Sequence, residues 1–256
     1  MGESGVEVVE KLLPQLKIDR AVDLVIAQAE NVTAGRGIST ADYERLVEAG
    51  VDFFTGGNHI FDEKEIFPLL EDTSKPIIRP ANYPLGTPGH GSKYVAVPNG
   101  QVLIISLLGQ IVGKQASQHL DNPLKVVDRI LAEHQSEARV ATIVNFHGDF
   151  SSEKVIIGHY LDGRVSAVIG DHWHIPTADA RVLPKGTAHI TDVGMCGVLN
   201  SSLGVTFDSV IPRWRDNIQT RNILETTGPR QLNAVEVVVG DKGLASSIEH
   251  LHVLIA

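Results

Sequence analysis

The chain has 256 residues, of which 43% are hydrophobic and 21% are charged, a balance typical of a globular protein with a sizeable core. Its formal net charge of −9 and the lack of a Lys/Arg cluster argue against a protein that binds the nucleic-acid backbone. No apolar run approaches the length of a membrane span, and the start of the chain is neither a signal nor a transit peptide. A single cysteine, Cys196, excludes an internal disulfide framework and is typical of a reducing compartment, so we expect a cytoplasmic protein.

Hydrophobic periodicity predicts alternating helices and strands along most of the chain. Gly5–Leu16 is a predicted helix that ends or kinks near Pro14, and Ala21–Gln28 is a predicted buried strand. Ser39 or Thr40 can cap a helix that runs through Ala49. The elements predicted next are strand Val51–Thr55, helix Asp62–Leu70, a hairpin of Lys93–Pro98 and Gln101–Leu108, helix Asn122–Glu137, strand Arg139–Asn145, helix Ser151–Tyr160 and strand Val165–Ile169.

The pattern is weaker after Gly197. A helix near Phe207–Trp214 and a terminal hairpin of Leu232–Val239 and Leu244–Ile255 are the predicted elements there. No internal repeat, low-complexity tract or linker divides the chain. We therefore expect one α/β domain that covers residues 1–256.

Four predicted strands are followed by polar residues that can bind metals. Ligands of α/β proteins gather beyond the carboxyl ends of the strands, so these side chains are expected in one crevice. A carboxylate, amides and imidazoles suit Mn, Fe or Zn better than Ca, and their number suggests two ions bridged by the carboxylate. The residues are Glu30 and Asn31, Asn58 and His59, His147, and His172 with His174.

The histidine pair His172-Trp173-His174 follows the last of these strands. In an extended backbone, side chains two residues apart point to the same side, which predicts half of a metal site. A pair of surface histidines is the alternative. His250-x-His252 has the same spacing within a predicted strand, where we expect a solvated strand face.

The other candidates also have structural interpretations, which the sequence leaves open. Glu30 and Asn31 could hydrogen-bond the glycine-bearing loop that follows them, and Asn58 could be a turn residue in a left-handed conformation. His59 and His147 could be structural histidines with ordinary hydrogen-bond partners.

Several short motifs follow one another in a characteristic order. They are AEN (29–31), GNH (57–59), RPANYPLGTPG (79–89), a single histidine before a helix (His147), SSEK (151–154), GDHWH (170–174) and LPKGTAHITDVGM (183–195). The sequence resembles the YmdB-like branch of the calcineurin-type metallophosphoesterases over nearly its whole length, most weakly after Gly204. The resemblance implies a four-layer α-β-β-α sandwich of two packed mixed sheets with two divalent or transition metal ions (Fe, Mn, Zn or Mg). It also implies hydrolysis of a small phosphodiester, a cyclic nucleotide such as 2′,3′-cyclic AMP.

The resemblance also implies a role for each candidate residue. Glu30 would bridge the two ions. Asn31 and His174 would bind one ion, and the second would be bound by Asn58, His147 and His172. His59 would be the general acid that protonates the leaving alkoxide after metal-bound hydroxide attacks phosphorus.

Three departures from the family pattern are visible. The family begins with a strand that ends in Gly-Asp, and this sequence starts at Met1 without that strand and its aspartate ligand. Either the sequence is a truncated product of a longer gene, or the first metal site is incomplete. Asp171 replaces the usual threonine before the first histidine and could accept the N–H of the neighbouring imidazole. Cys196 replaces the usual threonine after the DVGM motif and is expected to be a small buried side chain.

Two other functions compete with this hypothesis. A mononuclear metal hydrolase of the amidohydrolase type also carries H-x-H at a strand end, although there the pair lies early in a barrel of eight βα units. A metallophosphoesterase-fold protein that has lost a ligand could instead be a binding or regulatory scaffold. Metal stoichiometry separates these possibilities. We expect no membrane partner, and a homo-oligomer is compatible with the sequence.

Overall fold

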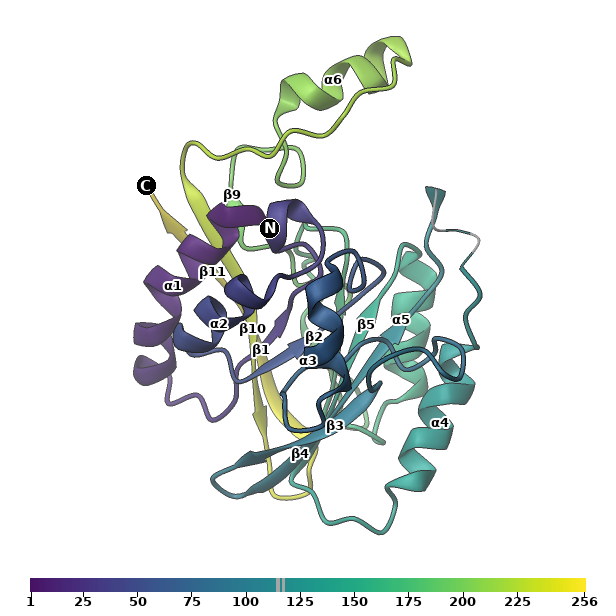
Figure 1. Cartoon of the computed structure of the whole chain (residues 1–256). Helices are drawn as coiled ribbons and strands as arrows, with labels where there is room; N and C mark the ends of the chain where they lie inside the picture. Colours follow the sequence, from purple (N-terminus) through teal and green to yellow (C-terminus); the bar gives the residue numbers. More distant parts are fainter. Residues whose placement is uncertain (114–115, 117) are drawn as a thin grey trace.

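Strand β4 (Gly100–Leu108) lies inside the molecule because apolar side chains occupy both of its faces. Leu103 and Ile105 pack against helices, whereas Val102 and Ile104 pack against a second layer of strands. This alternation is the two-residue period of a strand that is covered on both sides. The computed structural model describes residues 1–113, 116 and 118–256 (Figure 1).

Six strands form the larger sheet, in the order β3-β4-β5-β6-β8-β7. Strands β4, β5, β6 and β8 are parallel, whereas β3 and β7 are antiparallel edge strands, so the sheet is mixed. The carboxyl ends of β5 and β6 therefore lie side by side. The bounds besides those of β4 are Ser92–Val97 for β3, Ala141–His147 for β5, Ala167–Asp171 for β6, Arg181–Val182 for β7 and Ala188–Ile190 for β8.

The second strand layer consists of two hydrogen-bonded pieces. Strands β1 (Ile26–Gln28) and β2 (Phe53–Thr55) are parallel, and β2 packs through Phe53 against Ile104 of the larger sheet. The other piece packs through Ala245 against Ala167. It contains the antiparallel strands β9 (Gly197–Val198), β10 (Arg230–Val239) and β11 (Ala245–Ile255).

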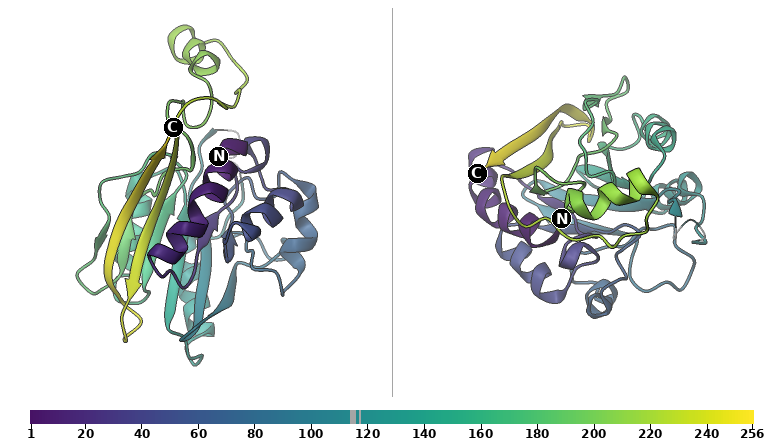
Figure 2. Two further views of the ribbon diagram at one scale, coloured as in Figure 1. Left: turned by 90° about the vertical axis from the view of Figure 1, so that its left-hand side faces the viewer. Right: turned by 90° about the horizontal axis from the view of Figure 1, so that it is seen from above.

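Helices cover both outer faces of the two strand layers (Figure 2). On the side of β1 and β2 lie α1, α2 and α3 with two short 3₁₀ helices, and α1 also contacts β9 and β10. On the other side, α4 and α5 cover the larger sheet. The bounds are Gly2–Asp19 for α1, Thr33–Gly35 for η1, Thr40–Glu48 for α2, Lys64–Ile66 for η2, Phe67–Glu71 for α3, Pro123–Glu133 for α4 and Ser151–Tyr160 for α5.

This layering confirms the expected four-layer α-β-β-α sandwich. It excludes the barrel of the amidohydrolase type, because the parallel strands belong to layers packed face to face and not to a closed ring. Helix α6 (Phe207–Asp216) stands away from the sandwich at one end of the molecule (Figures 1 and 2). In the part of the chain that the structure describes, no helix is long and apolar enough to cross a membrane.

The helix and strand limits differ from the predicted ones at several places. Helix α1 does not end at Pro14 but continues to Asp19, where Arg20 N–H donates to Leu16 O over 3.1 Å. The predicted strand Ala21–Gln28 is shortened to β1, whose three residues pair with the three residues of β2, and Ala21, two residues after α1, has a left-handed φ of 49°. The predicted helix Asp62–Leu70 is divided into η2 and α3.

The two central strands end two residues later than predicted. As a result, His147 is the last residue of β5 and Asp171 is the last residue of β6. The hairpin of β3 and β4, helix α5 and the terminal hairpin of β10 and β11 are confirmed. Strands β7, β8 and β9 were not predicted, since runs of two or three residues are too short for their period to be recognised.

Candidate metal centre

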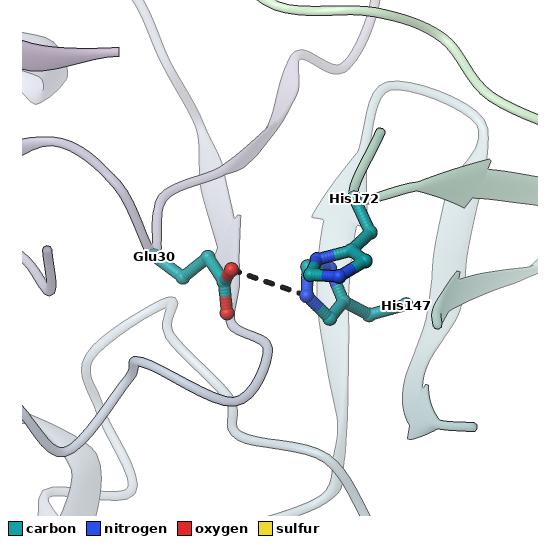
Figure 3. Close-up of side chains that lie close together, drawn as sticks. All are labelled: Glu30, His147 and His172. Carbon is teal, nitrogen blue, oxygen red and sulfur yellow. Dashed lines mark ion pairs between the residues drawn. The ribbon is translucent and has the colours of Figure 1, made fainter. Parts of the chain in front are cut away.

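Glu30 follows β1 in one strand layer, and His147 ends β5 in the other. The side chains of Glu30, His147 and His172 point toward one another (Figure 3), with one ligand atom of each within 4.8 Å of the others. His147 Nε2 lies 3.1 Å from Glu30 Oε1 and 2.8 Å from Asn58 Oδ1. The structure thus brings four of the predicted metal ligands to one place.

Gly57 makes room for this close approach. A Cβ atom built at this position would lie 2.2 Å from Glu30 Oε2 and 2.6 Å from the ring of His147. The next peptide adds a contact, because His59 N–H donates to Glu30 Oε2 over 3.0 Å. The segment after β2 therefore approaches the carboxylate through its backbone.

The other two predicted ligands, Asn31 and His174, form a separate pair. His174 Nε2 lies 3.3 Å from Asn31 Oδ1. The amide nitrogen of Asn31 donates to Gly35 O over 3.0 Å, which turns its oxygen toward His174. Nδ1 of His174 contacts Leu203 O at 3.0 Å, and donation of its proton to that carbonyl leaves Nε2 free to act as a ligand.

The backbone conformation of His172 and His174 differs from the predicted one. They lie in a loop after β6 and not in extended backbone, and both have left-handed φ values, 115° for His172 and 64° for His174. The expectation that both point to the same side of an extended strand is therefore wrong. His172 joins Glu30 and His147, whereas His174 joins Asn31.

Two buried ligand atoms in the centre form no hydrogen bond with any residue that the structure describes. They are His172 Nδ1 and Glu30 Oε1, and the latter is nevertheless ion-paired with His147 Nε2 at 3.1 Å. Buried polar atoms without hydrogen bonds are rare in proteins, and a divalent cation would satisfy both of these atoms. The donor set of carboxylate, amide and imidazole fits such an ion by its chemistry as well.

Electrostatics couples the two residues of the central ion pair. Burial would raise the pKa of Glu30, but the facing charge of His147 outweighs burial and lowers it to about 2. Burial likewise opposes protonation of His147, but the Glu30 and Asp171 carboxylates raise its pKa to about 10. Without an ion, the positive charge in the centre is therefore that of the His147 imidazolium.

Two aspartates, Asp171 and Asp149, contact the proposed histidine ligands. Asp171 accepts hydrogen bonds from His147 Nδ1 and from the amide of Asn145. The expected hydrogen bond from the neighbouring His172 to Asp171 is not formed. Instead, Nε2 of His172 lies 3.1 Å from Asp149 Oδ1. Sequence reasoning missed Asp149, although its place two residues after the end of β5 was a usable signal.

His59 lies beside the centre, and its ring Nδ1 is 2.9 Å from Asp62 Oδ2. If Nδ1 donates to this carboxylate, Nε2 is left to exchange a proton with a substrate. Arg36 Nε lies 3.8 Å from the same carboxylate oxygen. Asp62 was missed in the sequence, although its position three residues after His59, within the GNHIFD segment, was a usable signal.

Comparison with known proteins identifies relatives that span most of this chain. A model of the family described as YmdB-like protein matches residues 1–251. The chain is 37% identical over 242 residues to the 2′,3′-cyclic-nucleotide 2′-phosphodiesterase of Bacillus subtilis (strain 168), covering 94% of this chain and 89% of the relative.

Two solved structures are similar over nearly the whole chain. One is a hypothetical protein from Thermus thermophilus, with a TM-score of 0.89, 38% identity and coverage of 99% of this chain and 96% of that one. The other is described as a novel phosphatase from Mycoplasma pneumoniae, with a TM-score of 0.90, 31% identity and coverage of 99% and 90%.

Proposed function

The chain belongs to the YmdB-like protein family and is a phosphoric diester hydrolase, and we propose that its substrate is a small cyclic nucleotide such as 2′,3′-cyclic AMP. The convergence of Glu30, His147 and His172 within 4.8 Å is the observation that carries the proposal. The reaction named for the Bacillus subtilis relative supports the choice of substrate.

The enzyme is proposed to bind two divalent metal ions. Asn58, His147 and His172 are the proposed ligands of one ion, and Asn31 and His174 those of the other. Glu30 is the proposed bridge, since its carboxylate has two oxygens and lies between His147, which contacts Oε1, and His59 N–H, which contacts Oε2. Bound ions would lower the pKa of a shared water and offset the negative charge of the phosphodiester.

His59 is the proposed general acid. When a water oxygen attacks phosphorus, the 2′- or 3′-oxygen of the ribose leaves and takes a proton from the imidazolium of His59. Asp62 orients this ring through Nδ1, and the hydrogen bond from His59 N–H to Glu30 fixes its backbone beside the ligands. His59 therefore acts next to the metal ligands without being one.

Hydrolysis of 2′,3′-cyclic AMP by the purified chain with added Mn²⁺ tests this function. We expect turnover by the wild type and by His252→Ala, the matched control from the second H-x-H pair. His252 lies in β11, where it contacts Gln231. His172→Ala should lose both activity and metal. An inactive wild type that binds metal, or full activity in His172→Ala, would contradict the proposal.

Two further expectations stay predictions, the cytoplasmic location and the homo-oligomer. Helix α6 supports the second, because Phe207, Ile211 and Trp214 form an exposed apolar stripe at helical spacing, with Trp214 81% exposed. Light scattering of the wild type and of Trp214→Asp tests it. A monomeric wild type would contradict this expectation.

A further inference from the structure

Lys154 and Asp192 form a buried ion pair behind the loop that carries the two histidines. Lys154 Nζ lies 2.7 Å from Asp192 Oδ2, and the side chains are 0% and 1% exposed. Lys154 belongs to α5, whereas Asp192 follows β8. Two charges removed from water in this way are costly unless each is fully hydrogen-bonded, so the further contacts of Asp192 are informative.

Both oxygens of Asp192 accept hydrogen bonds from backbone N–H groups. Oδ2, which receives Lys154, also accepts from Trp173 N–H over 2.8 Å. Oδ1 accepts from Gly194 N–H over 2.9 Å. The carboxylate therefore ties the loop after β6 to the segment after β8, and Lys154 balances its charge.

The side chain of Trp173 also makes two contacts. Lys154 Nζ lies 4.1 Å from the centre of the Trp173 ring, a cation–π contact. The indole N–H donates to Asp149 O over 3.0 Å. Backbone and side chain of the residue between the two histidines are thus both fixed.

The backbone on either side of Trp173 needs such support. His172 and His174 both have positive φ values, which residues with a Cβ rarely adopt. Such conformations persist where the surrounding structure holds them. Trp173 can stabilise the backbone of both histidines, because it lies between them and contacts Lys154, Asp192 and Asp149.

We propose that Lys154 and Asp192 are positioning residues that hold His172 and His174 in place for metal binding. The ion pair touches neither histidine and acts through Trp173. This inference rests on the proposed metal-dependent function. It predicts that loss of the pair weakens metal binding while the fold is retained.

Calorimetric titration with Mn²⁺ of the purified chain tests the inference, with the folded state checked by circular dichroism. Lys154→Met leaves the Asp192 carboxylate buried without its partner and is expected to lower the melting temperature. The main variant is therefore Lys154→Met combined with Asp192→Asn, which buries no charge. Trp173 N–H and Gly194 N–H bond to different oxygens of Asp192, so in the Asp192→Asn side chain one of them would face the amide NH₂ group, which cannot accept a hydrogen bond.

We expect the folded double variant to bind Mn²⁺ roughly 10-fold more weakly, the lower end of the range for groups that contact metal ligands directly, because the ion pair acts on the histidines through Trp173. The control is Arg164→Met, which removes a partly exposed ion pair between Arg164, after the end of α5, and Asp128 of α4. This control should bind Mn²⁺ like the wild type.

The outcomes separate the inference from the function on which it rests. A double variant that is folded and binds Mn²⁺ as tightly as the wild type overturns the positioning role, and so does an equal loss in Arg164→Met. If the double variant does not fold, the folded fraction of Lys154→Met below its melting temperature is titrated instead, with the same two criteria. A wild type that binds no Mn²⁺ overturns the proposed function itself.

Discussion

Glu30 and His147 are ion-paired across the two strand layers, with 3.1 Å between Oε1 and Nε2 and with each side chain 1% exposed. One residue follows β1 and the other ends β5, so the pair forms only when the layers pack face to face. The candidate centre therefore depends on the sandwich as a whole. Removing one partner would leave the other charge buried alone, a change that typically costs about 3–5 kcal/mol.

Stability of the metal-free protein should depend on pH through this pair. The lowered pKa of Glu30 stabilises the fold above pH 4.5, and this contribution is lost as the pH falls toward 2. The raised pKa of His147 stabilises the fold below pH 6.5, and this contribution is lost as the pH rises toward 10. Urea unfolding of the metal-free protein should therefore give the highest free energy of unfolding between pH 4.5 and pH 6.5.

The same unfolding series in His147→Asn is the control, since asparagine does not titrate. In this variant the decline above pH 6.5 should be much smaller. An unfolding free energy of the metal-free wild type that stays constant from pH 6.5 to 10 would show that His147 is not held as an imidazolium.

His59→Ala should retain metal and lose activity. General acid catalysis typically contributes roughly 10²- to 10⁴-fold, so the turnover number with 2′,3′-cyclic AMP should fall by that factor. The contact with Glu30 is made by the backbone N–H of His59, which alanine keeps. Full turnover, or loss of metal together with turnover, would refute the role given to this residue.

Asp62→Ala should lower the turnover number by less than His59→Ala does, by roughly 10- to 100-fold, because the His59 ring loses its orientation. Asp62→Asn keeps an oxygen that accepts from Nδ1 and should retain most of the activity. Steady-state kinetics of both variants checks this prediction. An equal loss in Asn and Ala would indicate that the charge of Asp62 matters more than its position.

Gly57→Ala should disrupt the centre. The new methyl group would overlap Glu30 and His147, and overpacking of this kind typically costs about 1–3 kcal/mol. We expect a lower melting temperature and a reduced metal content by elemental analysis. Gly240→Ala is the control, because its Cβ would meet only Leu244 O at 3.7 Å. A Gly57→Ala protein with normal metal content would contradict the close approach.

The long elements, and the convergence of several polar residues at the strand ends, could be predicted from the sequence for physical reasons. Helix α5 and the hairpin of β3 and β4 have clear periods and turn signals, and the polar residues after parallel strands were expected to converge. Whether these residues bind metal is a separate matter that the proposed experiments address.

What could not be predicted depends on tertiary contacts. The left-handed backbone of His172 and His174 is tied to contacts of Trp173 with Asp192, and the two residues of that contact are 19 positions apart. The partner of Asp171 is likewise distant in sequence, since it is His147 on the neighbouring strand and not His172 next to it. Local patterns carry no information on such pairings.

Elemental analysis of the wild type after mild purification tests the central claim most directly. The claim is that Glu30, His147 and His172 with their neighbours hold a pair of metal ions. It predicts about two equivalents of a divalent or transition metal per chain, with a clear decrease in Glu30→Gln. One equivalent or none in the wild type, after incubation with Mn²⁺, would contradict it.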